Sequence, residues 1–234
     1  MGYVTVSEAG ADGVAVLAVD RPPVNAMNVE LLEQVIVAVN AVAAAPPRAL
    51  VLTGRESCFS AGADLKAVPG YGQDEHRRMI NGINEMAIGV YGLRCPVVAA
   101  INGHAIAGGL VLALCTDLRV ASNAGQYGLT EIKVGVPYPQ AAIAVVRAEL
   151  APHAARSLAL GNALFDSKEC LRLGVFDELA EPDGVLPRAL ELARGLAAFE
   201  PGAYWRTKND MRGAAIEAMR AAAADDPLLA ALAG

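Results

Sequence analysis

The stretch INGHAIAGGLVLAL, residues 101–114, decides the fold because it joins a buried strand to a buried helix. Val97–Ile101 (VVAAI) is short, apolar and partly β-branched, which predicts a strand covered on both faces. Asn102-Gly103 ends this strand, and Gly108-Gly109 lets the backbone approach a neighbouring segment closely. The apolar run that begins at Leu110 predicts an interior helix.

The start of that helix is a candidate site for a developing negative charge. Its first N–H groups have no partners within the helix and lie at the positive end of the helix dipole. The stretch contains no Lys or Arg, so a neutral carbonyl whose oxygen becomes negative would suit it. Close packing of the strand on the helix explains the glycines equally well, and these residues alone do not separate the two interpretations.

The composition predicts an apolar, oligomeric protein. Its 234 residues suffice for one domain with a substantial core, and 54% of them are hydrophobic. The mean hydropathy of +0.36 is high, yet charges, Gly or Pro interrupt every apolar run before the roughly 18–20 residues of a membrane span. We therefore expect no membrane segment, and we expect the excess apolar surface to lie between subunits.

Three features of the sequence bear on binding partners and on cellular location. They are the net charge, the spacing of the cysteines and the residues at the start of the sequence. The net charge is −6 without a cluster of Lys or Arg, which argues against nucleic acid as a partner. Cys58, Cys95, Cys115 and Cys170 lack CxxC spacing and have apolar neighbours, which favours reduced thiols over a disulfide or a zinc site. No basic segment followed by an apolar one opens the chain, so we expect no export signal and a cytoplasmic location.

Strands and helices are expected to alternate with short connections, which is typical of an α/β fold. The expected strands are 3–8, Val14–Val19, Ala49–Thr53, Val97–Ile101, 118–121 and 175–179. The expected helices are 29–45, 74–93, 140–150, 152–160, 167–173 and 184–198, followed by an Ala-rich helical unit from Pro201. Asn28 and Ser167 are the expected N-caps of two helices, and 54–72 is expected to be a long loop.

Several common active-site motifs do not occur in the sequence. No GxGxxG follows a strand, and the segment 103–108 lacks the Lys-Ser/Thr of a P-loop. A serine elbow GxSxG would need glycine where the chain has Cys58. His76, His104 and His153 show no spacing of paired metal ligands, so surface or structural roles are favoured for them. The candidate active site that remains combines a carboxylate side chain with backbone N–H donors of the glycine-bearing turn.

Residues 60–64 form a second glycine-bearing turn after an apolar strand. Gly62 allows an unusual backbone conformation in this turn. Two such turns, each at the end of a strand, could direct two N–H donors at one oxygen. That arrangement is the oxyanion hole of a thioester enolate, which stabilises charge only as it develops.

Seven segments, in order and at matching spacing, resemble the enoyl-CoA hydratase/isomerase (crotonase) superfamily. They are 21–28 (RPPVNAMN), 59–65 (FSAGADL), 101–105 (INGHA), Gly108-Gly109, 115–119 (CTDLR), 127–131 (YGLTE) and 161–174. The similarity covers about residues 14–190, and the C-terminal helices match least well. Each motif is weak alone, but together they are a specific signal.

The resemblance implies an α/β fold, a crotonase-like spiral of ββα units with a C-terminal helical unit. It implies an acyl-CoA-binding core over residues 1–190 and a C-terminal helical trimerisation region over residues 191–234. The implied assembly is a homotrimer or a dimer of trimers. The implied substrate is an acyl-CoA thioester, so coenzyme A is part of the substrate, and neither a separate cofactor nor a metal is expected.

Carried over position by position, the resemblance makes the N–H groups of Ala63 and Gly108 the two oxyanion donors. It implies coenzyme A contacts, mostly through the backbone, at Val24, Ala26, Ala61, Ala63, Asp64, Leu65 and Gly108. Lys66 is a candidate phosphate contact, although an exposed loop lysine is more often simply solvated.

Position 111 departs from the hydratases of the superfamily. They carry glutamates there and at the position of Glu131, whereas this chain has Val111, whose side chain cannot hold a water. Hydration benefits from two carboxylates, so Glu131 alone favours Δ3-to-Δ2 migration, in which it takes a proton from C2 and returns it at C4. The local sequence GLTE is similar to the single-glutamate isomerases, and Val111 should desolvate Glu131 and raise its pKa.

Two other functions are compatible with the sequence. A hydratase or an acyl-CoA hydrolase would need a second acid, for which Asp74, Glu75 or Glu85 of the neighbouring helix are candidates. A non-catalytic acyl-CoA-binding subunit is also compatible, although the presence of Glu131 weighs against it. Tyr138 has two candidate roles, capping the acyl pocket or packing, and the sequence does not choose between them.

Overall fold

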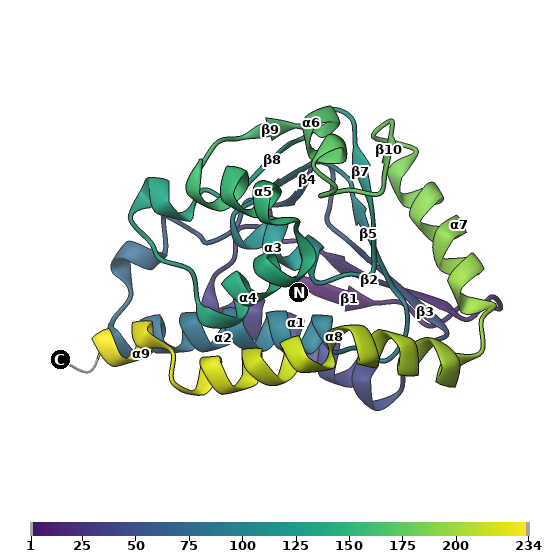
Figure 1. Cartoon of the computed structure of the whole chain (residues 1–234), viewed down its shortest axis with the longest axis horizontal. Helices are drawn as coiled ribbons and strands as arrows, with labels where there is room; N and C mark the ends of the chain where they lie inside the picture. Colours follow the sequence, from purple (N-terminus) through teal and green to yellow (C-terminus); the bar gives the residue numbers. More distant parts are fainter. Residues whose placement is uncertain (1, 233–234) are drawn as a thin grey trace.

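The computed structural model describes residues 2–232, in which the strands form two sheets. The six-stranded sheet has the order β1-β2-β3-β5-β7-β10. Its strands are β1 (Val4–Val6), β2 (Val14–Val19), β3 (Ala49–Thr53), β5 (Val97–Ile101), β7 (Leu118–Ser122) and β10 (Glu178–Ala180). β1 and β2 are antiparallel, and the other neighbours are parallel. This sheet contains the predicted buried strands in the expected α/β arrangement (Figure 1).

Alternate residues of the central strands face two hydrophobic layers. Val51 of β3 and Val98 of β5 pack with α7 (Val185–Ala197), which covers one face of the sheet. Leu50 and Ile101, which alternate with them, belong to the main core on the other face. All five residues of each of these strands are buried, which confirms the prediction made from the VVAAI segment.

The four-stranded sheet has the order β4-β6-β8-β9. Its strands are β4 (Cys58–Ser60), β6 (His104–Ile106), β8 (Gln126–Gly128) and β9 (Phe165–Asp166). The sequence did not predict β4, which lies in the expected loop 54–72, or β6, which lies in the expected strand-to-helix turn. Three residues are too few for a clear period-two pattern, and turn residues flank both strands.

Three successive units run from the large sheet to the small sheet and then into a helix. They are β3-β4-α2, β5-β6-α3 and β7-β8-α4, with α2 at Gln73–Tyr91, α3 at Gly108–Leu114 and α4 at Gln140–Glu149. Each unit advances by one strand in both sheets, because β3-β5-β7 and β4-β6-β8 are neighbours in order. The predicted spiral of ββα units is therefore confirmed.

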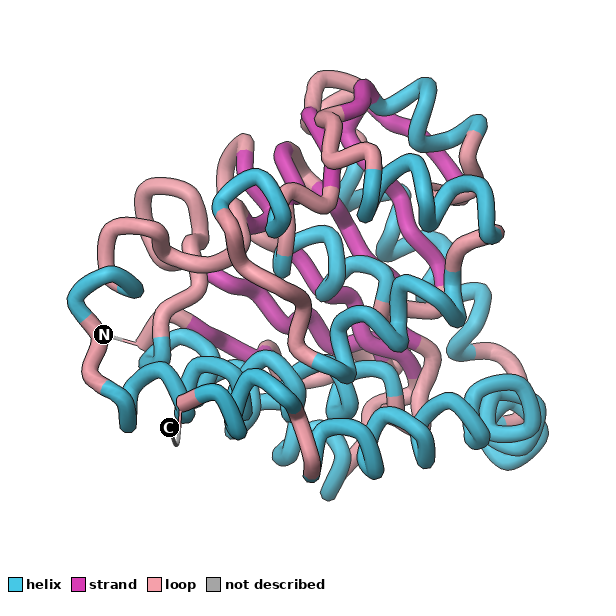
Figure 2. The backbone as a smooth tube through the Cα atoms, turned by 60° about the vertical axis from the view of Figure 1, so that its left-hand side comes forward, coloured by secondary structure: helices cyan, strands magenta, loops and turns pink. Residues whose placement is uncertain are grey.

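The remaining helical segments complete the layer around the sheets. They are α1 (Val29–Ala44), α5 (Pro152–Ala155), α6 (Ser167–Arg172), α8 (Pro201–Ala224) and α9 (Pro227–Ala231), the 3-10 turns η1 (Val68–Gly70) and η2 (Glu131–Val134), and the π-helical turn η3 (Arg156–Leu160). The long helix α8 packs along α2 and α4. In Figure 1 the helices α1, α2 and α8 lie beneath the strands and α7 lies beside them, and Figure 2 also shows helices beneath the strands. No helix within residues 2–232 is both long and apolar enough to cross a membrane.

The structure corrects one of the two predicted helix caps. Asn28 is the N-cap of α1, as predicted, and its side chain accepts a first-turn N–H at 2.9 Å. At α6 the N-cap is Asp166 rather than Ser167, because the Asp166 carboxylate accepts the Glu169 N–H at 2.8 Å. Ser167 is instead the first helical residue, and its hydroxyl donates to the carbonyl of Asn123 at 3.0 Å.

Several predicted boundaries also shift. The predicted strand 175–179 appears as β10, which starts three residues later because Val175 and Phe176 fill the core. The predicted helix 152–160 divides into α5 and η3, and the predicted strand 3–8 shortens to β1. Residue 191, the predicted start of a trimerisation region, lies inside α7. The role of the C-terminal helices in trimerisation stays a prediction.

Candidate active site

The proline-containing segment after β2 lies against the segment after β4. The Ala61 N–H donates to the carbonyl of Val24 at 3.0 Å, and the Met27 N–H donates to that of Gly62 at 2.7 Å. The Asp64 N–H returns a bond to the carbonyl of Met27 at 2.8 Å. These bonds align the residues that the resemblance assigned to coenzyme A along one joined pair of loops.

Asn25 and Arg21 fasten these two loops to each other. Asn25 is buried at a positive φ of 51°, and its amide nitrogen donates to the carbonyls of Cys58 and Phe59 at 2.9 and 3.2 Å. The Arg21 guanidinium pairs with the Asp64 carboxylate at 2.8 Å, with both side chains largely shielded from solvent. The loops are thus preorganised by buried contacts between segments far apart in the sequence.

The residues assigned to coenzyme A differ in exposure and in hydrogen bonding. Val24, Leu65 and Lys66 are exposed along the joined loops, where a ligand could reach them. Asp64 is different, because its carboxylate binds Arg21 and accepts N–H groups of its own loop, and its backbone N–H is occupied by Met27. Asp64 therefore anchors the loop. Ala26, Ala61, Ala63 and Gly108 are half-buried.

The turns that carry Ala63 and Gly108 touch. Gly62 has a φ of +76°, and a Cβ atom there would lie 2.8 Å from the carbonyl oxygen of Ile106 and 3.1 Å from the Gly108 nitrogen. A Cβ atom on Gly109 would lie 2.2 Å from the carbonyl oxygen of Ser60. Only glycine fits this contact, which confirms the close backbone approach predicted for Gly108-Gly109.

The amides of Ala63 and Gly108 are free, whereas their neighbours are bonded. Within residues 2–232 neither N–H donates to a protein acceptor, while the Asp64 N–H and the Ala107 N–H do so. Ala107 has a positive φ of 52° although it carries a side chain, and such strained residues concentrate at functional sites. Two touching turns therefore present two unused donors, as the predicted oxyanion hole requires.

Glu131 begins η2, directly after β8, and its segment is bonded to the Gly108 turn. The Ala107 N–H donates to the carbonyl of Gly128 at 2.8 Å, which joins the end of β8 to the start of α3. The Glu131 Oε2 atom is buried and has no hydrogen-bond partner within the described part of the chain. Burial raises the pKa of this carboxyl, and Tyr138 acts in the opposite direction. A partly desolvated, unpaired carboxylate is the form expected of a catalytic base.

Tyr138 is the neighbour of Glu131 that sequence reasoning left unassigned. Its side chain packs against the main core, and its hydroxyl is buried without a partner among the described residues. Burial raises the pKa of Tyr138, and the Glu131 charge raises it further. The two groups thus interact electrostatically, although no hydrogen bond of acceptable geometry joins them.

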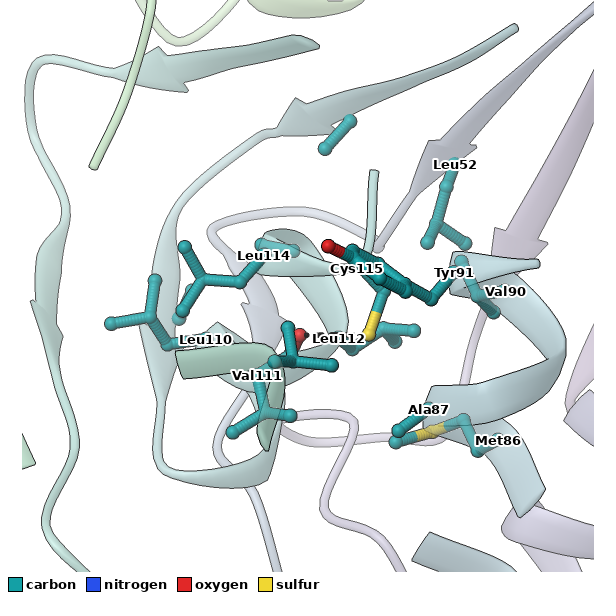
Figure 3. Packing of buried hydrophobic residues seen from close by; sticks show 14 of the residues in the cluster. Leu52, Met86, Ala87, Val90, Tyr91, Leu110, Val111, Leu112, Leu114 and Cys115 are labelled. Atoms are coloured by element: carbon teal, nitrogen blue, oxygen red, sulfur yellow. Dashed lines mark hydrogen bonds between the residues drawn. The ribbon is translucent and has the colours of Figure 1, made fainter. Parts of the chain in front are cut away.

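The position of a second carboxylate is apolar. Val111 is fully buried in α3 and lies among the core side chains (Figure 3). The alternative acids Asp74, Glu75 and Glu85 are all exposed on α2, and Glu75 accepts the N–H of the residue that caps its own helix. None of the three is desolvated as Glu131 is.

The contacts of His76 and His104 and the burial of the cysteines are typical of structural residues. The His104 Nδ1 atom accepts the Gln126 N–H at 3.1 Å between β6 and β8, and His76 contacts the start of α2. All four cysteines are buried and unpaired, and burial raises the pKa of Cys58 to about 11. No three His, Cys, Asp or Glu side chains from residues 2–232 are grouped so that they could hold a metal ion.

The two sheets, the ββα spiral and the long C-terminal helix define an α/β protein of the crotonase fold. A model of the enoyl-CoA hydratase/isomerase family matches residues 9–229. The chain therefore belongs to the enoyl-CoA hydratase/isomerase (crotonase) family of acyl-CoA enzymes.

Relatives of known name divide between two activities. Probable enoyl-CoA hydratase EchA17 of Mycobacterium tuberculosis H37Rv is 33% identical over 207 residues, 88% of this chain and 79% of that protein. The mitochondrial enoyl-CoA delta isomerase 1 of Mus musculus is 32% identical over 216 residues, 90% of this chain and 74% of that protein. Family membership therefore does not distinguish a hydratase from an isomerase, and the distinction must come from the residues of the site.

Solved structures divide in the same way. EchA3 of M. tuberculosis, described as a probable enoyl-CoA hydratase, superposes with a TM-score of 0.91 at 31% identity, covering 99% of this chain and 97% of that chain. A second structure of the same protein, described as an enoyl-CoA isomerase, has a TM-score of 0.86 at 31% identity and the same coverage. One fold, and even one protein, thus carries both names.

Proposed function

We propose that this protein is an enoyl-CoA isomerase that moves the double bond of a 3-enoyl-CoA thioester to position 2. The observation that carries the proposal is the buried, unpartnered Oε2 atom of the Glu131 carboxylate, together with Val111 where hydratases of the superfamily hold a second glutamate. Relatives named as isomerases at 31–32% identity support the same choice.

One carboxylate is sufficient for this reaction. Glu131 removes a proton from C2, and the electrons shift to give a dienolate whose thioester oxygen carries the negative charge. The N–H groups of Ala63 and Gly108 donate to that oxygen as its charge develops. Glu131 then returns the proton at C4, which leaves the double bond between C2 and C3. Every atom of the substrate is retained, and no water enters the reaction.

The coenzyme A portion would lie along the joined loops. Val24 and Leu65 offer exposed apolar side chains, and Lys66 offers a cation to a phosphate. Ala26 and Ala61 add small, half-buried side chains, while the Ala26 carbonyl accepts from the Arg21 guanidinium at 2.8 Å and the Ala61 N–H donates to the Val24 carbonyl at 3.0 Å. The Arg21–Asp64 ion pair would hold this surface in shape without touching the substrate.

The test is turnover of 3-hexenoyl-CoA and 2-hexenoyl-CoA by the wild type, Glu131→Gln and Glu85→Gln. The wild type should convert the 3-enoyl to the 2-enoyl thioester, Glu131→Gln should lose at least about 1,000-fold in kcat, and the exposed Glu85→Gln should match the wild type. Addition of water to the 2-enoyl substrate would identify a hydratase, and release of free coenzyme A would identify a hydrolase. Tight coenzyme A binding without turnover would identify a binding subunit.

The family resemblance also leads us to propose a homotrimer or a dimer of trimers. Large apolar side chains are exposed on several elements, among them Ile132, Val134, Val136, Leu160 and Leu164 on and beside η2 and η3. Such side chains are commonly covered by a second subunit. Sedimentation equilibrium should give a mass of three or six times the 24.1 kDa chain, and a monomeric mass would contradict the proposal.

A further inference from the structure

The segment that follows η3 runs beside the end of β8. Strand β9, which closes this segment, pairs with β8 in antiparallel register. Before β9 the two backbones come very close, because a Cβ atom on Gly128 would lie 2.5 Å from the carbonyl oxygen of Ala163. Residues 161–164 are therefore packed against the strand end that directly precedes Glu131.

Asn162 turns the chain out of η3. Its N–H donates to the carbonyl of Leu158 at 3.2 Å, and its φ of 54° lies in the left-handed region, which asparagine adopts more readily than most residues. Glycine would supply this backbone conformation equally well. The turn alone therefore does not require the carboxamide of the half-buried Asn162 side chain.

That carboxamide bridges the two sides of Glu131. The carbonyl oxygen of Leu129 and the backbone N–H of Lys133 both lie within hydrogen-bond distance of it. Because a carbonyl accepts and an N–H donates, these two partners set the orientation of the amide. Its nitrogen donates to the Leu129 carbonyl at 3.1 Å, and its oxygen accepts the Lys133 N–H at 2.7 Å. One side chain thus spans residues 129–133, with Glu131 at their centre.

The turn that carries Glu131 has little other support. Residues 132–137 are exposed, and the Val136 N–H donates back to the carbonyl of Glu131 at 3.0 Å, inside the same turn. Among the residues that the structure describes, the bond from Lys133 to Asn162 is the one hydrogen bond that joins residues 130–136 to another segment. Asn162 therefore ties this exposed turn to the body of the protein.

Glu131 depends on such a support. Its buried Oε2 atom has no hydrogen-bond partner within residues 2–232, so no bond at that oxygen orients the carboxylate. A reacting group must be held closely, since a misplacement of about 1 Å can slow a reaction about 100-fold. The backbone on either side of Glu131, which Asn162 holds, must then set where the carboxylate lies.

We propose that Asn162 is a positioning residue, whose carboxamide fixes the turn of Glu131 and so directs the carboxylate at the substrate. The inference rests on the proposed function, in which Glu131 must reach both C2 and C4 of the acyl chain. Asn162 acts through Glu131 and takes no part in a proton transfer.

The test compares the wild type, Asn162→Gly and Asn123→Ala. Glycine keeps the left-handed backbone and removes the carboxamide, so a role in the turn alone predicts no change in Asn162→Gly. Asn123→Ala is the matched control, because it also removes an asparagine side-chain bond, that from the exposed Asn123 to Glu181 at 2.6 Å. The D₂O exchange rate of the Lys133 N–H is measured without substrate. The kcat and KM for 3-hexenoyl-CoA are measured well below the melting temperature of each protein.

In Asn162→Gly the Lys133 N–H should exchange about tenfold faster than in the wild type, because it loses an acceptor. The kcat should fall roughly 10- to 100-fold with KM within about twofold, since a misplaced base slows the chemical step without weakening binding. Asn123→Ala should match the wild type in every quantity. Unchanged exchange in Asn162→Gly, or faster exchange with the kcat of the wild type, would overturn the inference.

The inference and the proposed function can fail separately. A wild type that adds water to 2-hexenoyl-CoA would refute the isomerase. The same fall in kcat at constant KM, measured in that reaction for Asn162→Gly, would still support the positioning role.

The wild type supplies a second test if Asn162→Gly does not fold. A side-chain N–H of Asn162 that donates to the Leu129 carbonyl should exchange with D₂O more slowly than the side-chain N–H groups of the exposed Asn209. Equal rates for the two asparagines would overturn the inference.

Discussion

At the scale of single residues, the partial burial of Glu131 lowers the stability of the folded protein at neutral pH. Its pKa is raised in the folded protein, chiefly by burial. The contribution of this carboxyl to stability is therefore fully present below about pH 4.3, where an unfolded glutamate ionises, and is lost as the pH rises through the higher folded pKa. Such a cost is usual where a protein keeps a charge for chemistry.

Because the Glu131 carboxyl group loses stabilising energy as the pH rises, a prediction follows for Glu131→Gln. Because glutamine resembles the neutral acid, the variant should melt at a higher temperature than the wild type at pH 7 and at nearly the same temperature at pH 4. Calorimetry across this range measures the difference, with the exposed Glu85→Gln as the control that follows the wild type. A Glu131→Gln variant less stable than the wild type at pH 7 would mean that the carboxylate is favourably paired.

Gly109 offers a second prediction at this scale. A Cβ atom in Gly109→Ala would meet the carbonyl oxygen of Ser60 at 2.2 Å, so one of the two turns must move. The variant should lose at least about 2 kcal/mol of stability, as overpacking does, and most of its turnover. Gly195→Ala is the matched control, because its Cβ meets nothing within 4 Å on α7 and it should gain about 0.5–1 kcal/mol. Equal denaturation midpoints for the two variants would contradict the close approach.

The sequence points to some candidate site residues and not to others for a physical reason. Ala63, Gly108 and Glu131 stand in motifs of local sequence, so the resemblance could propose roles for them. Arg21 and Asn25 act through contacts that join the loop after β2 to the segment around β4, more than thirty positions along the chain. Contacts of such long range leave no local pattern in the sequence.

At the scale of elements, α8 is held to the body by buried charges. The Asp117 carboxylate, just before β7, accepts from Lys208 and Arg212 of α8, each at 2.8 Å, and from the Val97 N–H at 2.8 Å. Arg212 also pairs with Glu149 at the end of α4 at 3.0 Å. These side chains are about nine-tenths shielded, so each depends on the others.

Asp117→Asn should therefore destabilise the protein by about 3 kcal/mol, because it leaves two buried cations with one carboxylate fewer. Urea denaturation measures the change. Glu169→Gln is the control, since its ion pair with Arg172 on α6 is exposed and its removal should have little effect. Similar losses in both variants would show that the buried cluster does not hold α8.

The elements differ in how far the sequence could predict them. Strands β3 and β5 and helix α1 appear as expected. Burial of one or two faces requires apolar residues at regular positions, and these elements are long enough for that pattern to be recognised in the sequence. β4 and β6 were missed because three residues carry no period. Asp and Ser are both good N-cap residue types, so the sequence does not separate Asp166 from Ser167, and only the structure shows that the Asp166 side chain caps the helix.

At the scale of the whole molecule, the ββα spiral brings the separate parts of the site together. Two successive units place the ends of β4 and β6 side by side, so the turns of Ala63 and Gly108 touch. The third unit adds β8 beside β6, and Glu131 follows β8 at the start of η2. A repeated step of one strand thus places the Ala63 turn, the Gly108 turn and Glu131 after three neighbouring strands of the small sheet.

The central claim is that one buried carboxylate carries a proton from C2 to C4. The most direct measurement follows 3-hexenoyl-CoA deuterated at C2 by NMR during turnover in ordinary water. A shuttle shielded from solvent, as the buried Oε2 of Glu131 is, should deliver part of the deuterium to C4 of the 2-hexenoyl product. A product with solvent hydrogen alone at C4, or a hydroxyl group at C3, would contradict the one-carboxylate account.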